Sequence, residues 1–293
     1  MPIIEAEGRR LPLTHLGKVL YPATGSTKSE VLHYYATVAQ VMLPHLRNRP
    51  LSFLRYPDGA EGETFFTKNP PAGTPEWVTV ADVPKSDGEL TRRVLVQDLP
   101  SLMWAANLVV EFHTPQWTTA APRHADRLVL DLDPGAPATI VDCCRAALWL
   151  RDRLAADGLE CHAKTAGSKG LHLLCAVEPV PAERTTAYAK ALAVEAARAL
   201  PDLVVHRMAR ELRPGKVFVD YSQNAAAKTT ASPYTLRARR RPLVSTPVTW
   251  EEIAGCTEPE QLEFPYQEVP ARLRRYGDLL RPLCDPERAH RLP

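Results

Sequence analysis

Two aspartates separated by a single residue have the clearest potential for chemistry in this sequence. Asp131 and Asp133 lie in LVLDLDPG, where alternating apolar residues predict a strand over 127–133. Successive side chains of a strand alternate between its faces, so both carboxylates are expected to project from one face just before a Pro-Gly turn. Asp220 ends another short apolar run, KVFVD, in the same way. Three carboxylates are therefore expected to converge where strands stop.

Three carboxylates form the ligand set of hard divalent cations such as Mg²⁺ or Mn²⁺. Two such ions about 3.5–4 Å apart would stabilise the attacking and leaving oxygens of a phosphoryl transfer. The alternative is that an isolated D-x-D pattern only starts a turn or caps a helix. The surrounding sequence has to decide between these two interpretations.

A glycine-punctuated loop leading into a strand, KTAGSKGLH, favours the catalytic interpretation. Gly167 and Gly170 allow backbone N–H groups to approach an anion, and Ser168 and Lys169 add a hydroxyl donor and a positive charge. His172 alternates with two leucines and is expected to point where the aspartates point, although a lone strand histidine is also a common structural residue. The spacing of a P-loop is absent. We interpret the loop as a triphosphate-binding segment.

Further polar and basic residues follow the third aspartate. Gln223 and Lys228 lead to Arg237 and Arg239, which would face one side if this segment is extended, as contact with phosphate oxygens requires. The alternative is a solvated basic strand.

Two other pairs suggest contacts with nucleic acid. Lys18 and Lys28 flank a turn before a predicted helix, where two ammonium groups can hold a phosphate. Phe65 and Phe66 are adjacent, so in a strand one is expected in the core and the other exposed for base stacking. Surface lysines and core aromatics are the alternatives for these pairs.

Composition excludes several classes of protein. The chain has 293 residues, 45% of them apolar, with 36 Lys and Arg against 34 Asp and Glu. This profile excludes a disordered tail protein, and neither a membrane-length apolar run nor a signal-peptide core is present. The six cysteines form no C-x-x-C pair, so we expect no zinc site. We expect a cytoplasmic, nucleoid-associated protein that does not contact membranes.

The elements that position these residues mix helices with strands. Helices are predicted from Thr27 to about His45, from Asp98 until Pro115 stops it, from Thr139 to Gly158, and over 182–199. Strands are predicted over 127–133, 170–177 and 216–220. No repeat or flexible linker interrupts the chain. These elements predict one α/β or α+β domain over 1–293.

Six motifs in order resemble the polymerase domain of bacterial ligase D, which belongs to the archaeo-eukaryotic primase superfamily. They are KVLYPATGSTK, EFHTPQW, LVLDLDPG, KTAGSKGLHL, KVFVDYSQNAAAKTT and SPYTLRARRRP, and the resemblance covers about residues 13–276. It implies an α+β fold with a primase-type catalytic core and mixed sheets flanked by helices. It also implies template-directed addition of nucleotides at broken DNA ends during non-homologous end joining, with ribonucleotides and Mn²⁺ favoured.

The resemblance also implies roles for individual residues. Residues matching the catalytic, metal-binding aspartates are Asp131, Asp133 and Asp220. Residues matching nucleotide contacts are Ser168, Lys169, Gly170, His172, Gln223, Lys228, Arg237 and Arg239, with His113 near the incoming sugar. Residues matching DNA contacts are Lys18 and Lys28 for a downstream 5′-phosphate, Phe65 and Phe66 near the template, and Arg213 in a loop that helps order the site.

We expect one ion, held by all three aspartates, to activate the primer 3′-hydroxyl, and a second, held by Asp131 and Asp133, to bridge the NTP or dNTP triphosphate. The rival hypotheses are a primase that starts chains without a primer, a non-catalytic DNA end-binding module, and a metal-dependent nuclease, which has no need of a triphosphate loop. Expected partners are 5′-phosphorylated or gapped DNA and, from the family alone, the end-binding protein Ku. A free-standing polymerase would also need a separate ATP-dependent ligase, whereas the sequence is equally compatible with an excised domain.

Overall fold

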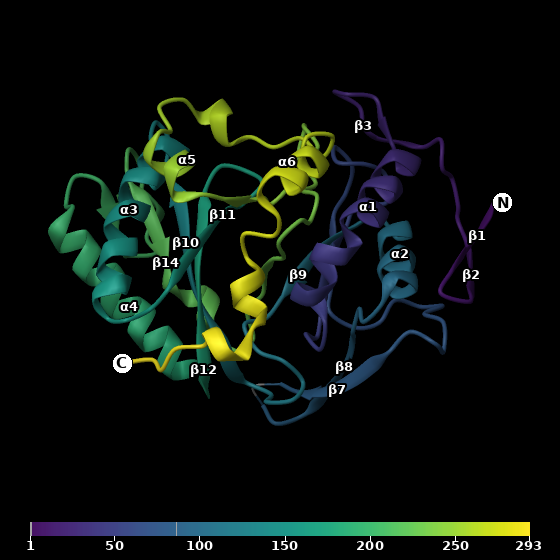
Figure 1. The fold of residues 1–293 in the computed structure, drawn as a ribbon, viewed down its shortest axis with the longest axis horizontal. Helices are drawn as coiled ribbons and strands as arrows, with labels where there is room; N and C mark the ends of the chain where they lie inside the picture. Colours follow the sequence, from purple (N-terminus) through teal and green to yellow (C-terminus); the bar gives the residue numbers. More distant parts are fainter. Residues whose placement is uncertain (1, 86) are drawn as a thin grey trace. The chain divides into compact units, whose positions relative to one another are not determined.

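The computed structural model describes residues 2–85 and 87–293, and internal contacts divide the chain into two compact units (Figure 1). Unit 1 comprises Met1–Thr114, Thr230–Ser245 and Phe264–Gly277, and unit 2 comprises Pro115–Thr229, Thr246–Glu263 and Asp278–Pro293. Residues 1 and 86 lie outside the described residues. Each unit is therefore assembled from segments far apart in the chain, and the expectation of one domain over 1–293 stays a prediction.

Unit 1 is built around its first helix, α1 (Lys28–Leu46). The helix starts after Thr27, as predicted, with a capping box: the Thr27 hydroxyl accepts from the Glu30 N–H, and the Glu30 carboxylate accepts from the Thr27 N–H at 2.7 Å. On its buried face Tyr34 donates its hydroxyl to the Tyr234 carbonyl at 2.8 Å, and Tyr35 packs edge-on against Phe112. The helix thus carries the apolar surface on which the rest of the unit is assembled.

The second helix of unit 1, α2 (Leu99–Asn107), begins after its Asp98 cap as expected but ends earlier than expected. Val109 adopts a left-handed conformation with φ of 58°, which breaks the helix well before Pro115. The residues that follow form a strand. The prediction that Pro115 stops this helix is therefore wrong.

Of the strands described in unit 1, four form an antiparallel sheet in the order β15-β9-β5-β6. The others form the hairpins β1–β2, β3–β4 and β7–β8. A short helix, α6, completes the unit. The bounds are β1 (Ile3–Ala6), β2 (Arg9–Pro12), β3 (Val19–Tyr21), β4 (Ser26–Thr27), β5 (Ser52–Arg55), β6 (Phe65–Thr67), β7 (Val80–Pro84), β8 (Leu90–Val94), β9 (Val110–Thr114), β15 (Thr230–Ala231) and α6 (Val269–Tyr276).

Within the described residues of unit 2, six strands form one mixed sheet in the order β13-β14-β10-β12-β11-β16. All neighbours are antiparallel except β13 and β14, which are parallel. The three predicted strands are present as β10, β12 and β14, the first two longer than expected. The bounds are β10 (His124–Pro134), β11 (Cys161–Thr165), β12 (Leu171–Pro181), β13 (Val204–Val205), β14 (Val217–Asp220) and β16 (Pro247–Val248).

Helices α3 (Ile140–Ala156) and α4 (Ala182–Ala199) pack on this sheet and on each other, as Figure 1 shows. Both lie where the sequence predicts them, and Thr139 forms the expected capping box with Asp142. The remaining helical turns of unit 2 are shorter. They are α5 (Trp250–Ala254), η1 (Arg210–Leu212), η2 (Tyr221–Asn224), η3 (Pro259–Leu262), η4 (Arg281–Cys284) and η5 (Pro286–Arg288).

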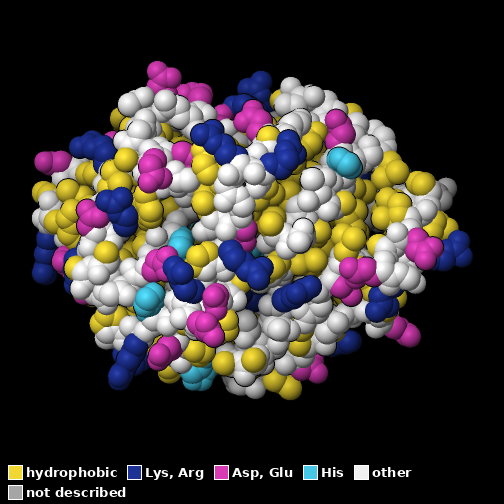
Figure 2. Space-filling model, in the orientation of Figure 1, with side chains coloured by type: hydrophobic (Ala, Val, Ile, Leu, Met, Phe, Trp, Pro, Cys, Tyr) yellow, Lys and Arg dark blue, Asp and Glu magenta, His cyan; other side chains and the backbone are white. Residues whose placement is uncertain are grey.

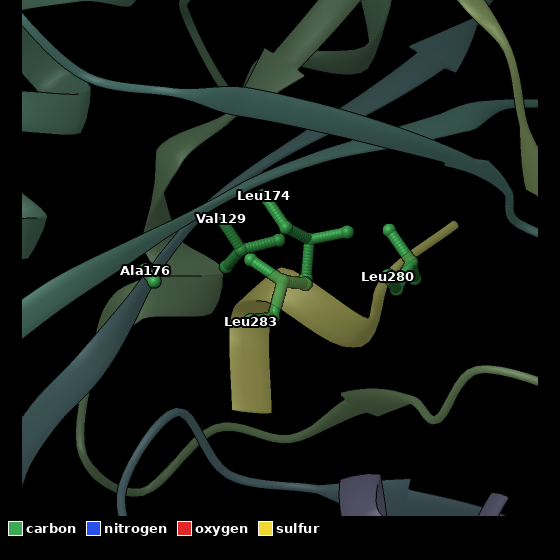
Figure 3. Packing of buried hydrophobic residues seen from close by; sticks show 5 residues of the cluster. All are labelled: Val129, Leu174, Ala176, Leu280 and Leu283. Atoms are coloured by element: carbon green, nitrogen blue, oxygen red, sulfur yellow. The ribbon is translucent and has the colours of Figure 1, made fainter. Parts of the chain in front are cut away.

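The C-terminal segment of unit 2 closes part of the sheet. Val129 of β10 and Leu174 of β12 are cross-strand partners, and they pack with Leu280 and Leu283 in one buried cluster (Figure 3). Side chains two residues apart on a strand share a face. Val129 therefore lies on the same sheet face as Asp131, and apolar residues of the C-terminal segment cover this face at Val129.

Charged side chains of both signs are interspersed on the face drawn in Figure 2, in keeping with the net charge of +2. Attraction for a polyanion therefore has to come from local groups of basic residues. In the described part of the chain, no helix combines the length and the apolar character that a membrane crossing requires.

Candidate active site

A row of four polar side chains crosses the sheet of unit 2. Lys164 lies opposite His172, His172 lies opposite Asp131, and Asp131 lies opposite Asp220. Directly opposed residues of antiparallel strands project from the same face, and Asp133 shares that face because it lies two residues beyond Asp131. The strand order therefore places all three aspartates on one face, as the alternation predicts.

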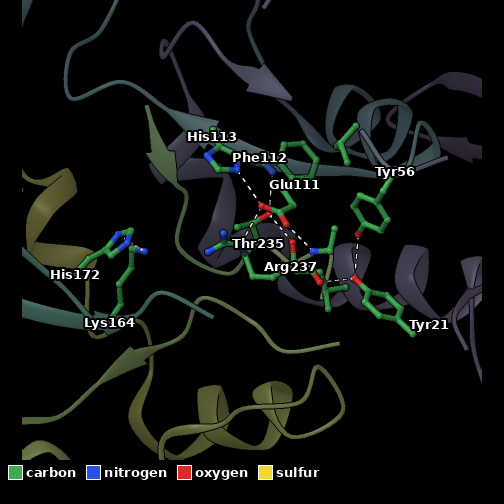
Figure 4. A network of polar contacts seen from close by, with 12 residues as sticks. Tyr21, Tyr56, Glu111, Phe112, His113, Lys164, His172, Thr235 and Arg237 are labelled. Atoms are coloured by element: carbon green, nitrogen blue, oxygen red, sulfur yellow. Dashed lines mark hydrogen bonds and ion pairs between the residues drawn. The ribbon is translucent and has the colours of Figure 1, made fainter. Parts of the chain in front are cut away.

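Polar contacts connect three members of the row. Lys164 Nζ lies 3.0 Å from His172 Nδ1 (Figure 4), and His172 Nε2 lies 3.4 Å from Asp131 Oδ1. Lys164 is fully buried. Sequence reasoning placed Lys164 in the loop KTAGSKGLH and gave it no role, whereas it lies in β11, a strand not predicted from the sequence.

The third aspartate is held by the turn that follows it. Its Oδ1 accepts from the Ser222 N–H at 2.9 Å and the Ser222 hydroxyl at 2.6 Å, and its Oδ2 accepts from Gln223 Nε2 at 2.9 Å. The buried Asn224 side chain exchanges two hydrogen bonds with the Val129 backbone. Asn224 therefore fixes η2 to β10, and η2 in turn fixes the carboxylate of Asp220.

This arrangement bears on metal binding. Across residues 2–85 and 87–293, no group of three His, Cys, Asp or Glu side chains is arranged to hold a metal ion. The donor chemistry nevertheless suits a hard cation, because three carboxylates project from one face of adjacent strands. Oδ2 of Asp220 accepts one of the hydrogen bonds of its turn, so the carboxylate has the acceptor capacity to bind an ion while the turn holds it.

The predicted triphosphate loop lies directly against β10. A Cβ at Gly170 would be 2.1 Å from the Leu132 carbonyl oxygen, so only glycine permits this approach. Gly167 adopts φ of 68°, and the Lys169 ammonium donates to the Pro134 carbonyl at 3.1 Å. The half-buried Ser168 lies between them. The loop is therefore held beside the end of the strand that carries Asp131 and Asp133.

The loop that carries Arg213 packs beside the same strand end. A Cβ at Gly135 would lie 2.1 Å from the Arg213 carbonyl oxygen, and the Arg213 guanidinium lies 3.8 Å from the centroid of the Phe218 ring. Phe218 is the cross-strand partner of Asp133 and shares its face. Arg213 thus lies close to the aspartates, whereas Lys228 is exposed after η2.

In unit 1 the hairpin β3–β4 brings the two predicted phosphate-binding lysines together. The Lys28 N–H donates to the Lys18 carbonyl at 2.8 Å, and both side chains line a cavity of about 570 Å³ together with Arg55. Lys18 pairs with Asp58 at 2.8 Å, and Lys28 donates to the Thr14 hydroxyl at 3.2 Å. The pair therefore lies in a basic pocket and not on an open surface.

The two ammonium groups differ in their surroundings. The Lys28 side chain is almost fully buried, whereas Lys18 is partly exposed. Burial, with a smaller contribution from the positive charge of Lys18, lowers the pKa of Lys28 to about 8. Burial and the neighbouring positive charge both destabilise the ammonium form of Lys28, so an anion bound between the two lysines would stabilise it.

A buried carboxylate that sequence reasoning missed organises another group in unit 1. Glu111 of β9 accepts from His113 Nε2 at 3.0 Å, Arg237 Nε at 2.9 Å and the Ala238 N–H at 2.6 Å (Figure 4). His113 and Arg237 are thereby brought together although they are far apart in the sequence. The available signal was the spacing E-x-H in EFHTPQW, which puts Glu111 and His113 on one face of a strand.

The segment that carries Arg237 and Arg239 is not extended, so the condition under which both side chains would face one side is not met. The Arg239 N–H donates to the Arg237 carbonyl at 2.9 Å, which closes a tight turn between them. The Arg237 side chain folds onto Glu111, whereas Arg239 is exposed. The buried carboxylate of Glu111 accounts for this difference, because it forms an ion pair with the guanidinium of Arg237.

The expectation that one of the two adjacent phenylalanines is in the core is also wrong. Phe65 and Phe66 are 49% and 53% exposed, because β6 is the edge strand of its sheet and leaves both of its faces open near the edge. Phe66 lies edge-on to His113 with ring centroids 6.1 Å apart. Both rings are therefore available for stacking.

Comparison with known proteins identifies relatives that match most of the chain. The family described as "LigD, primase-polymerase domain" matches residues 27–280. The "Multifunctional non-homologous end joining protein LigD" of Mycolicibacterium smegmatis is 42% identical over 94% of the chain, and the "Bifunctional non-homologous end joining protein LigD" of Bacillus subtilis is 30% identical over 92%. The chain spans 36% and 43% of the lengths of these two relatives.

A solved structure is similar to almost the same part of the chain. The "Polymerase Domain from Mycobacterium tuberculosis Ligase D in complex with DNA" superposes with a TM-score of 0.89 at 42% identity, and the match covers 94% of this chain and 98% of that one. This match confirms the α+β, primase-type fold that the sequence motifs predict.

Proposed function

Because the chain belongs to the LigD primase-polymerase domain family, we propose that it is a template-directed nucleotidyltransferase that extends 3′ ends at DNA breaks and gaps in bacterial non-homologous end joining. The observation that carries the proposal is the placement of Asp131, Asp133 and Asp220 on one sheet face, with a glycine loop beside the same strand end. This combination suits phosphoryl transfer from a nucleoside triphosphate.

The three aspartates are proposed to hold two divalent ions, Mn²⁺ or Mg²⁺. Bound there, such ions lower the pKa of a primer hydroxyl and neutralise the triphosphate. Ser168, the Gly170 backbone and the Lys169 ammonium are proposed to bind the triphosphate oxygens. Lys228, which follows η2 in the chain, is proposed to contact the incoming nucleotide. His172 is proposed to hold Asp131 in place through their contact at 3.4 Å, while Lys164 orients the ring from its other side.

Other residues are proposed to bind the remaining parts of the substrates. His113 and Arg237 would contact the sugar and phosphate of the incoming NTP or dNTP, and Phe66 and Phe65 would stack on template bases. The cavity at Lys18 and Lys28 would bind the 5′-phosphate of a downstream strand. The same proposal assigns nucleotide contacts to Gln223 and Arg239 and ordering of the site to Arg213.

The proposed partners follow from the relatives. One relative is a polymerase domain in complex with DNA, and others are named for non-homologous end joining. We accordingly propose gapped or broken DNA with 5′-phosphates as the substrate, Ku and an ATP-dependent ligase as partners, and the nucleoid in the cytoplasm as the place of action. Preferences for ribonucleotides and for Mn²⁺ belong to the same proposal.

Extension of a labelled primer on gapped DNA with a downstream 5′-phosphate tests this function. The assay compares NTPs with dNTPs and Mn²⁺ with Mg²⁺, and Asp131→Ala serves as the inactive control. Templated addition by the wild type alone would support the proposal. DNA binding without extension under any condition would favour an end-binding module, and synthesis on a template without primer would favour a primase.

A further inference from the structure

Arg93 of β8 is a half-buried cation without a counter-ion. Its Nη1 donates to the Ser52 hydroxyl at 3.2 Å, whereas its Nε is buried and has no hydrogen-bond partner. Across residues 2–85 and 87–293, no carboxylate forms an ion pair with this guanidinium, and burial alone lowers the pKa of Arg93. Arginine is seldom buried without a paired anion, because its lost hydration is then not compensated. The guanidinium therefore lacks the anion that would stabilise it.

The position of Arg93 is set by the attachment of the hairpin β7–β8 (Figure 1) to the four-stranded sheet of unit 1. The Leu51 N–H donates to the Val94 carbonyl at 3.0 Å, so the end of β8 lies against the start of β5. The hydrogen bond from Arg93 to the fully buried Ser52 is formed one residue away from this contact on each strand. The guanidinium is therefore anchored at the first residue of β5.

The sheet face at Ser52 also carries the open ring of Phe66. Leu54 lies opposite Phe66, and Ser52 shares the face of Leu54 because it lies two residues away on β5. Ser52 and Phe66 are thus diagonal neighbours across β5 and β6, about 7–8 Å apart. The Phe66 side chain is 53% exposed. The backbone of a DNA strand whose base stacks on this ring would lie within reach of a guanidinium anchored at Ser52.

We propose that Arg93 binds a backbone phosphate of the template strand whose base stacks on Phe66. This inference rests on the proposed polymerase function and adds to it a phosphate contact outside the sequence motifs. A guanidinium is permanently charged and presents several N–H donors in one plane, which suits phosphate oxygens. Phosphate contacts fix the register of a strand and carry no sequence information. Arg93 thereby holds the template strand at the stacking ring whatever its base sequence.

The test compares Arg93→Met, which removes the charge, with Arg92→Met, a matched change at an exposed arginine of the same strand. Binding of DNA with a recessed primer and a single-stranded template overhang is measured by fluorescence anisotropy at several salt concentrations. We expect Arg93→Met to weaken binding about tenfold, as for the loss of one charged hydrogen bond. The slope of the logarithm of the association constant against the logarithm of the salt concentration should become shallower by about 0.7–1. Arg92→Met should leave the affinity and the slope nearly unchanged.

Replacement of single template phosphates by uncharged methylphosphonates locates the contact. One linkage should weaken binding to the wild type and to Arg92→Met but not to Arg93→Met, because the group that contacts it is then absent. Arg93→Met should unfold in urea close to the wild-type midpoint, since relief of the dehydrated charge offsets the lost hydrogen bond to Ser52. Arg93→Gln keeps an N–H donor for Ser52 and repeats the comparison if Arg93→Met fails to fold.

Equal sensitivity of the wild type and Arg93→Met to every methylphosphonate, or an unchanged salt slope in Arg93→Met, would overturn the phosphate contact and leave the polymerase proposal intact. A less stable Arg93→Met with wild-type affinity for DNA would assign Arg93 a structural role instead. Wild-type protein that extends no primer with any nucleotide would overturn the proposed function, whereas the methylphosphonate series still decides whether Arg93 contacts a phosphate. The two failures are therefore distinguishable.

Discussion

We expect the buried ammonium group of Lys28 to lower the stability of the folded protein. Its pKa is lowered from 10.5 to about 8, mainly by burial. At about 1.36 kcal/mol per unit, this shift means that keeping Lys28 charged costs the folded state about 3 kcal/mol below pH 8. Lys28→Met removes the charge and keeps a similar length, so at pH 7 this variant should be more stable than the wild type by about 1–3 kcal/mol, after loss of the hydrogen bond to Thr14.

The pH dependence has a definite sign. Between pH 8 and 10.5 the folded wild type carries a neutral Lys28 while the unfolded chain binds a proton there, so the stability of the wild type rises with pH across this window. The advantage of Lys28→Met should therefore shrink above pH 8 and vanish near pH 10.5. Urea unfolding of both proteins at several pH values from 7 to 10 measures this difference directly.

Lys18→Met is the matched control, because the Lys18 ammonium is partly exposed and pairs with Asp58 at the surface. Its effect on stability should stay below about 1 kcal/mol. A Lys28→Met variant that is less stable than the wild type at pH 7, or a difference that does not change with pH, would refute the reasoning.

Three further predictions concern the proposed polymerase site. Asp131→Ala should abolish primer extension but leave the affinity for gapped DNA nearly unchanged in a fluorescence anisotropy titration; near-normal extension would remove Asp131 from the catalytic set. Gly170→Ala should lower the free energy of unfolding by about 1–3 kcal/mol and impair nucleotide use, because its Cβ would overlap the Leu132 carbonyl oxygen, whereas Gly17→Ala, with open space around it, should unfold like the wild type in urea. Phe66→Ala should weaken binding of the template strand by about 1–3 kcal/mol, and unchanged affinity would exclude stacking on this ring.

Local sequence information was sufficient for the starts of four helices, for three strands of the unit 2 sheet and for one important piece of geometry. Capping residues such as Thr27 and Thr139 mark helix starts because the signal lies within a few residues of the helix it begins. Alternation along β10 places Asp131 and Asp133 on one face for the same reason: the period of a strand is a property of the strand alone. The family motifs then assigned these residues to a polymerase, and the comparisons confirm that family.

Pairings between distant segments were decided only in the tertiary structure. The periodicity of a strand does not identify its neighbours, so the row from Lys164 through His172 to Asp131 depends on β10 and β11 both flanking β12. Glu111 captures Arg237 across 126 positions of sequence, and this contact turns the arginine away from the extended arrangement expected for it. Such hydrogen bonds form between groups that only the folded chain brings together, and burial makes them strong enough to override local preference.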